Sequence, residues 1–201
     1  MAHRQEPSIL KLPGLSSTAS VAAECRDAWR SFVEHSEEWG KTDLVLWTYG
    51  VLAPLTRFAE DALSSRVLGP AAVEHDFARV DVRFVDRLVR TARARVLDTL
   101  WSLETAEARV DFGYATLASG GVVACADARG RTGFVPSATR GPLAERVLAL
   151  VAADLLTAPE AFERDILCGD CGNVVLGPRP CCVSSELRYA AGEPEALRRQ
   201  R

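Results

Sequence analysis

The chain has 201 residues, 48% of which are hydrophobic, and a formal net charge of -3. This much apolar sequence is enough to bury a substantial core, so a chain that is disordered throughout is excluded. The small net charge excludes a global field that would attract nucleic acid or an anionic membrane, so binding of either must come from a local patch.

No apolar segment has the length that a signal peptide or a membrane span requires. Residues 1–14 are interrupted by Pro7 and Pro13, and the longest apolar run, residues 147–156, contains Asp154 and is too short to cross a bilayer. We therefore expect a cytoplasmic protein without membrane association, in which free thiols and metal thiolates persist longer than disulfides.

The N-terminal half is predicted to be helical after a short arm. Residues 1–16 show no hydrophobic periodicity and are expected to form a flexible arm or a peptide that docks in extended form. Residues 17–104 form the helical region, and its first helix follows a Ser/Thr-rich cap. Its apolar stripe consists of Val21, Cys25, Ala28, Trp29, Phe32 and Val33. Cys25 is therefore expected to be a packed core thiol.

Two further helices are predicted in this region. One is expected to be capped by Thr42 and Asp43 and to carry an apolar stripe over residues 44–62, which Pro54 should kink or split. A buried strand over residues 44–47 is the alternative, because four consecutive apolar residues fit both structures. The other helix is expected from about residue 78 to residue 103.

The composition changes in residues 105–160. Three short segments, 109–117, 121–127 and 131–136, are rich in Val, Phe, Tyr and Thr and are separated by glycine-containing turns, which predicts a three-stranded antiparallel meander. A helix is expected over residues 142–156. The pattern predicts an α+β fold, in which a helical N-terminal half precedes the meander, this helix and a C-terminal zinc-ribbon hairpin.

The cysteine-rich segment and tail, residues 161–201, are the one stretch whose residue types and spacing imply specific chemistry. A Cys-x-x-Cys-Gly motif at residues 168–172 is typical of a zinc knuckle, and two adjacent cysteines follow nine residues later. Residues 166–167 and 174–176 resemble the two strands of a ribbon hairpin. The predicted zinc ligands are Cys168, Cys171, Cys181 and Cys182. The spacing is similar to that of zinc ribbons in general, which implies a metal and a local fold but no function.

Two alternatives to a four-cysteine site remain open. Because neighbouring side chains in an extended segment point to opposite sides, adjacent Cys181 and Cys182 can share one metal only if the backbone bends sharply. Three cysteines with a fourth ligand are therefore a variant of the site. The candidates for that ligand are Asp170, His75, Glu186 and a water molecule. A dithiol redox pair at Cys168 and Cys171 is the second alternative, although the usual βαβ setting is missing.

Several other features have both a functional and a simpler interpretation. Arginines recur at helical spacing from Arg79 to Arg95, which suits binding to a phosphate backbone or to an acidic partner. The simpler interpretation is a solvated helix face with ion pairs such as Asp86 to Arg90.

Trp39 follows an acidic helix end and is a candidate for a partly exposed partner surface, although burial is the default.

Cys125 is a candidate nucleophile if His75 acts as its general base. The position of Cys125 in a predicted strand instead favours a thiol that is packed in the core.

The leading hypothesis is a non-catalytic, zinc-stabilised cytoplasmic protein that binds another protein as a regulator, adaptor or assembly component. The second hypothesis is a nucleic-acid-binding regulator that uses the Arg79–Arg95 helix and the ribbon. The third is an enzyme, either a thiol oxidoreductase at Cys168 and Cys171 or a zinc hydrolase with an open coordination position. Partner identity and oligomeric state do not follow from the sequence.

Overall fold

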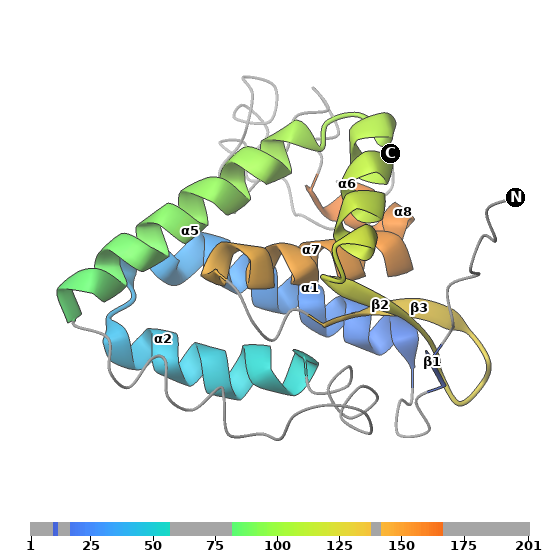
Figure 1. Ribbon diagram of the computed structural model, residues 1–201, viewed down its shortest axis with the longest axis horizontal. Helices are drawn as coiled ribbons and strands as arrows, with labels where there is room; N and C mark the ends of the chain where they lie inside the picture. Colours follow the sequence, from blue (N-terminus) through green and yellow to red (C-terminus); the bar gives the residue numbers. More distant parts are fainter. Residues whose placement is uncertain (1–9, 12–16, 57–81, 138–141, 167–201) are drawn as a thin grey trace, which may run out of the picture.

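The computed structural model describes residues 10–11, 17–56, 82–137 and 142–166 (Figure 1). These residues are mostly helical, and their sheet contains one antiparallel pair of strands. None of the described helices is both long enough and apolar enough to span a bilayer. The helices and the antiparallel strand pair confirm the predicted mixture of helices and a small antiparallel sheet.

Helix α7 (Leu143–Thr157) lies in the core, where α1 (Thr18–His35) and α5 (Val82–Ser102) pack against it (Figure 1). Every residue of α7 from Arg146 to Leu155 is buried. A helix that is apolar on nearly all sides is stable only when other elements surround it. The predicted helix over residues 142–156 is confirmed, with Pro142 as its N-cap.

Helix α1 forms as its sequence pattern predicts. The Ser17 hydroxyl caps it by accepting a hydrogen bond from the Ser20 N–H at 3.4 Å. The whole predicted stripe is buried, namely Val21, Cys25, Ala28, Trp29, Phe32 and Val33. Cys25 is thus the packed core thiol that its position indicated.

Helix α2 (Lys41–Trp47) continues into the π-helical turn η2 (Thr48–Leu52) and then into helical residues 53–56. The alternative of a strand over residues 44–47 is wrong. Pro54 has no N–H, and its ring would collide with the carbonyl four residues earlier in a regular helix. The wider π turn just before it accommodates that ring, so the helix changes register instead of ending.

Helix α5 confirms the third predicted helix over the described residues, and residues 78–81 of that prediction lie outside them. Its core side is formed by Val85, Val89, Ala92, Val96 and Leu100. These positions recur every three or four residues, so one face of the helix lies against α7 and the end of α1.

The prediction of a first meander strand over residues 109–117 is wrong. These residues belong to helix α6 (Ala106–Ala118). The Thr105 hydroxyl caps the helix by accepting from the Ala108 N–H at 3.1 Å. Buried Arg109 donates to the carbonyls of Leu103 and Glu104 at 3.0 and 3.1 Å. These bonds fix the corner between α5 and α6 and start a helix despite the β-prone side chains.

The other two predicted strands are confirmed. Strands β2 (Val122–Ala126) and β3 (Thr132–Pro136) pair antiparallel, with Ala124 opposite Phe134. The third member of the sheet is β1 (Leu10–Lys11), which pairs with β2 in parallel. The sheet order is β1-β2-β3, so the third strand comes from the N-terminal segment and the sheet is not a meander.

Helix α8 (Pro159–Ile166) follows α7 directly. Ile166 was expected in the first strand of a zinc ribbon, but it ends this helix and is buried in the core. The expectation of a strand at this position is wrong, because the apolar Ile166 side chain completes the core-facing side of a short helix. The remainder of the predicted ribbon, residues 167–201, lies outside the described residues.

Candidate functional site

The predicted zinc ligands Cys168, Cys171, Cys181 and Cys182 lie outside the described residues. The proposed fourth ligands Asp170, His75 and Glu186 lie outside them as well. Within residues 10–11, 17–56, 82–137 and 142–166, no three His, Cys, Asp or Glu side chains are grouped so that they could hold a metal ion. The zinc site therefore stays a prediction from the sequence.

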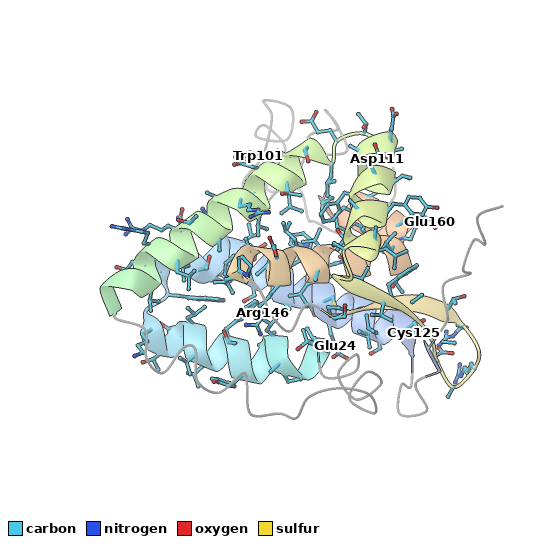
Figure 2. The ribbon with its side chains drawn as sticks, in the orientation of Figure 1. Glu24, Trp101, Asp111, Cys125, Arg146 and Glu160 are labelled. Atoms are coloured by element: carbon cyan, nitrogen blue, oxygen red, sulfur yellow. The ribbon has the colours of Figure 1, made fainter. Side chains whose placement is uncertain are left out.

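The two described cysteines are unsuited to act as nucleophiles. Cys125 on β2 is completely buried (Figure 2), and burial together with the charge of Asp127 raises the pKa of its thiol to about 11. Cys25 is also completely buried, and burial, then the charges of Asp154 and Glu24, raise the pKa of its thiol. Both thiols are protonated at neutral pH and are therefore poor nucleophiles. The burial of Cys125 confirms the prediction that its thiol is packed in the core.

The arginine-rich helix α5 uses two of its arginines to hold neighbouring elements. The Arg93 guanidinium donates to the Val33 carbonyl at 2.8 Å and to the Glu37 carboxylate at 2.6 Å. Arg95 lies 3.5 Å from the carboxylate of Glu145 on α7. These arginines therefore join α5 to the end of α1 and to α7 and do not form a free basic stripe.

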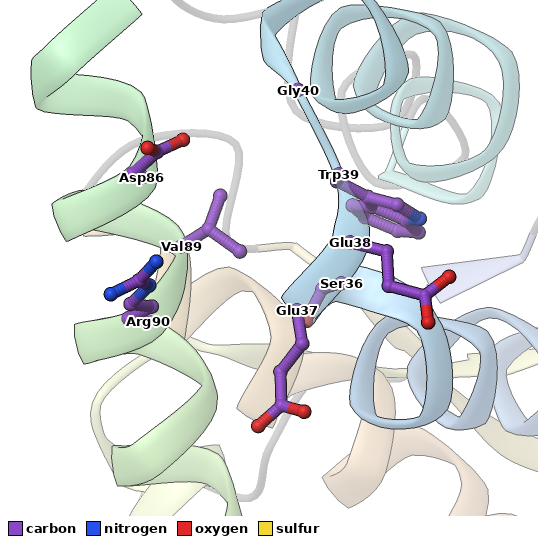
Figure 3. Close-up of a pocket in the computed structure, with 8 residues that line it drawn as sticks. All are labelled: Ser36, Glu37, Glu38, Trp39, Gly40, Asp86, Val89 and Arg90. Carbon is purple, nitrogen blue, oxygen red and sulfur yellow. The ribbon is translucent and has the colours of Figure 1, made fainter.

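A surface hollow of about 210 Å³ lies beside these contacts, between α5 and the connection from α1 to α2 (Figure 3). The 3-10 turn η1 (Ser36–Glu38) and the two residues after it form one side, and α5 forms the other. The hollow is lined by Ser36, Glu37, Glu38, Trp39, Gly40, Asp86, Val89 and Arg90. Its volume suits a group the size of a side chain better than a drug-sized ligand.

Local hydrogen bonds define the wall that η1 provides. The Ser36 N–H donates to the Phe32 carbonyl and so ends α1, and the Trp39 N–H donates to the Ser36 carbonyl at 3.3 Å. The Gly40 N–H donates to the Asp43 carboxylate at 2.9 Å, so the cap of α2 lies at Gly40 and not at Thr42. Both ends of the turn are therefore anchored in helices.

The Trp39 ring is fixed by aromatic contacts in this wall. Its centroid lies 5.7 Å from that of Phe32 and 5.5 Å from that of Trp47. The Trp39 side chain is only partly buried. An aromatic ring held by two others offers a rigid surface to a ligand.

The polar groups around the hollow are incompletely paired. Glu37 is bonded to Arg93, whereas Glu38, Asp86 and Arg90 form no ion pair or hydrogen bond with another described residue. The expected pair of Asp86 with Arg90 is thus absent from the described contacts. The Ser36 hydroxyl is buried and has no hydrogen-bond partner in the described part of the chain. Such a group costs free energy until something binds it.

A second cluster of the same residue types lies in the core. The Arg26 guanidinium donates to the two oxygens of the Asp154 carboxylate at 3.0 and 2.6 Å, and the Trp29 indole N–H donates to it at 3.1 Å. The sequence signals this cluster only through Asp154, which has apolar residues on both sides within α7. Arg26 and Trp29, both on α1, donate to Asp154 on α7, so this cluster holds α1 against α7.

Comparison of the chain with protein-family models, with curated proteins and with solved structures finds no match.

Proposed function

We propose that this protein is a non-catalytic binding protein that recognises a protein partner at the hollow between η1 and α5. One observation carries the proposal: Glu38, Asp86 and Arg90 line the hollow together with Trp39 and lack partners among the described residues. Unpaired charges and a partly exposed aromatic ring are groups through which protein surfaces recognise their partners. In this proposal the protein acts in the cytoplasm as a regulator, adaptor or assembly component.

The charges favour a protein over a nucleic acid as the partner. Of the predicted basic stripe, Arg93 and Arg95 are occupied by Glu37 and Glu145. The face around Arg90 also carries the carboxylates of Glu38 and Asp86. A phosphate backbone would meet these carboxylates as well as the arginine, and that repulsion opposes binding.

We further propose that a zinc ion bound by Cys168, Cys171, Cys181 and Cys182 stabilises the C-terminal segment as a ribbon. Its support is the spacing of the thiols, since Cys-x-x-Cys-Gly is typical of zinc knuckles. Mass spectrometry of protein purified without a metal-affinity tag should find one zinc per chain, and chelation should release about four thiols. Protein without metal whose Cys168 and Cys171 oxidise reversibly would instead support thiol redox chemistry.

The binding proposal is tested by affinity capture from cells that natively express the chain. The wild type is compared with the double variant Glu38→Gln/Asp86→Asn, in which two charges at the hollow are removed with little change in shape. The matched control is Glu107→Gln/Asp111→Asn, which removes two exposed carboxylates from α6 (Figure 2). The wild type and the control should capture the same partner, and the double variant should lose it.

Two outcomes would contradict this proposal. If all three proteins capture the same partners equally, the hollow is not the binding site. If nuclease treatment abolishes capture, and capture also falls steeply with added salt, the partner is a nucleic acid and the second hypothesis is favoured. Circular dichroism and thermal unfolding of each variant establish that a loss of capture does not come from a loss of folding.

A further inference from the structure

We propose that the exposed side of α6 is a second docking surface, which binds a basic amphipathic segment of a partner protein. This α6 face consists of Glu107, Val110, Asp111 and Tyr114. The four residues recur at intervals of three and four, so they lie on one side of the helix, and all of them are exposed. The proposal does not depend on the hollow, which is lined by residues of η1 and α5 and the two residues after η1.

The packing of α6 leaves large apolar side chains at the surface. Buried Gly113 lies against α7, where a Cβ atom at this position would come within 2.6 Å of a Leu156 methyl carbon. Helix α6 therefore approaches α7 closely (Figure 1). On the exposed side, Val110 and Tyr114 are 52% and 65% exposed. The outer side of a surface helix is ordinarily polar, so these two neighbouring side chains indicate an interaction.

The exposed charges beside these apolar side chains are negative. The carboxylates of Glu104, Glu107 and Asp111 form no ion pair or hydrogen bond with another described residue. The one basic residue of α6, Arg109, is buried and lies 2.8 Å from the carboxylate of Glu163 on α8. This cation does not offset the exposed carboxylates, so a basic partner complements the α6 face.

Two of these carboxylates also repel each other. Glu107 and Asp111 are four residues apart and occupy adjacent turns of α6, the helix on which Figure 2 labels Asp111. Like charges at this spacing destabilise a helix. A lysine or arginine of the partner that lies between them would remove this repulsion and form charge-assisted contacts with both.

Val110 and Tyr114 determine the apolar part of the ligand. They lie one turn apart, and the tyrosine ring offers a surface to an apolar side chain as well as to a cation. Carboxylates and apolar side chains alternate along the α6 face, so its partner needs basic and apolar side chains beside each other. An amphipathic helix with basic residues has this arrangement. A nucleic acid would instead be repelled by the carboxylates.

The test uses a synthetic peptide of about four helical turns in which lysine and leucine form an amphipathic helix. One control peptide has the same composition in scrambled order, and the other has glutamate in place of lysine. Binding to the full chain is followed by NMR of the ring signals of its three tyrosines, with Tyr114 assigned from Tyr114→Phe. The Tyr114 signal should shift saturably with the lysine peptide, at a dissociation constant on the order of 10–100 μM. The scrambled peptide should bind at least about tenfold more weakly, and the glutamate peptide should not bind.

The variants establish which groups bind the peptide, with affinities measured by fluorescence anisotropy of a labelled lysine peptide. Tyr114→Ala should weaken binding by at least about tenfold, because an aromatic contact is lost. Leu46→Ala is the matched control, since Leu46 on α2 is also 65% exposed, and it should leave the affinity unchanged. Glu107→Gln/Asp111→Asn should weaken binding by about fivefold and reduce its dependence on salt.

Several outcomes would overturn this inference. They are the absence of a saturable shift at Tyr114, binding of the glutamate peptide, and equal losses of affinity in Tyr114→Ala and Leu46→Ala. Sedimentation that shows self-association of the chain, abolished by Tyr114→Ala, would make the α6 face an interface between copies and would also overturn it. Unchanged thermal unfolding curves establish that each variant is folded.

The two surfaces are tested separately because each double variant is the control of the other. Glu38→Gln/Asp86→Asn should lose the partner captured at the hollow but bind the lysine peptide with unchanged affinity. Glu107→Gln/Asp111→Asn should keep that partner but bind the peptide more weakly. If the substitutions at the hollow abolish peptide binding, the peptide site is not the α6 face, and the inference falls while the proposed function stands.

Discussion

Two clusters of this protein contain the same residue types in different states. Asp154 on α7 accepts hydrogen bonds from Arg26 and Trp29 on α1, and it is fully buried. Around the hollow, Asp86 and Arg90 are exposed and are not bonded to each other. The first cluster has satisfied its charges internally, and the second has left them available.

The difference follows from burial. An ionised carboxylate inside a protein requires a charged or hydrogen-bonded partner, because its hydration has been lost. Asp154 receives three hydrogen bonds from Arg26 and Trp29 and so meets this condition. Water can solvate Asp86, so nothing in the fold forces a partner on it. The comparison indicates that Asp154 stabilises the fold, whereas Asp86 is available for binding.

The largest expected effect comes from Asp154→Ala. Removing this carboxylate leaves the Arg26 charge and the Trp29 indole N–H without their acceptor. Breaking one side of a buried pair costs about 3–5 kcal/mol of unfolding free energy. Urea denaturation measures this change, and Asp86→Ala serves as the matched control, with an expected change below about 0.5 kcal/mol. Equal effects of the two substitutions would remove the distinction between the clusters.

Arg93→Ala should have an intermediate effect, because Arg93 lies at the edge of the hollow but is bonded to the fold. It loses the hydrogen bonds to the Val33 carbonyl and the Glu37 carboxylate. Since Glu37 is largely exposed and can be solvated, the loss should be about 1–2 kcal/mol. Urea denaturation beside Arg87→Ala, an exposed arginine on the same helix, tests this value. A loss no larger than that of Arg87→Ala would show that the contact does not stabilise the fold.

Asp127 provides a third, local arrangement whose effect should depend on pH. Burial would raise the pKa of this carboxyl, but hydrogen bonds from the Arg131 and Arg129 N–H groups, together with the Arg131 guanidinium, outweigh burial and lower the pKa. A lowered folded pKa stabilises the protein above the unfolded value of 3.8. That stabilisation is lost as the pH falls through the folded pKa.

Asp127→Asn should therefore destabilise the protein at pH 7, by less than Arg93→Ala does, because the amide keeps an acceptor for the backbone N–H groups. The difference from the wild type should shrink below about pH 4 as the wild-type carboxyl becomes protonated. Unfolding free energies at several pH values measure it. A difference that is independent of pH would show that the charge of Asp127 does not contribute.

The helices of the core could be predicted because their apolar residues recur at helical spacing. In α1, α5 and α7 burial and intrinsic pattern agree, so local sequence was sufficient. The strand prediction for residues 109–117 is wrong because it rests on their content of Val, Phe, Tyr and Thr, which helices also accommodate. Val110 and Tyr114 lie four residues apart and share an exposed side of a helix. The contacts of Arg109 that fix this helix cannot be read from residue composition.

The hollow could be predicted only in part. Trp39 was identified as a candidate partner residue from its acidic neighbours and the following glycine. Asp86 was interpreted as the partner of Arg90 on the same helix, since helical spacing is all that a sequence shows. That Ser36 and Trp39 lie opposite Asp86 depends on the packing of α1 against α5, across almost fifty residues of sequence. The zinc site stays a prediction, because its cysteines lie outside the described residues.

The smallest expected effect on stability is that of Glu38→Gln/Asp86→Asn, the same variant that should lose the partner. Neither carboxylate has a partner among the described residues, so their neutralisation should change the unfolding free energy by less than about 0.5 kcal/mol. Urea denaturation beside Glu107→Gln/Asp111→Asn measures this change. A loss above about 1 kcal/mol would place these carboxylates in the same structural class as Asp154. Unchanged stability with lost capture would instead separate the charges that bind a partner from those that hold the fold.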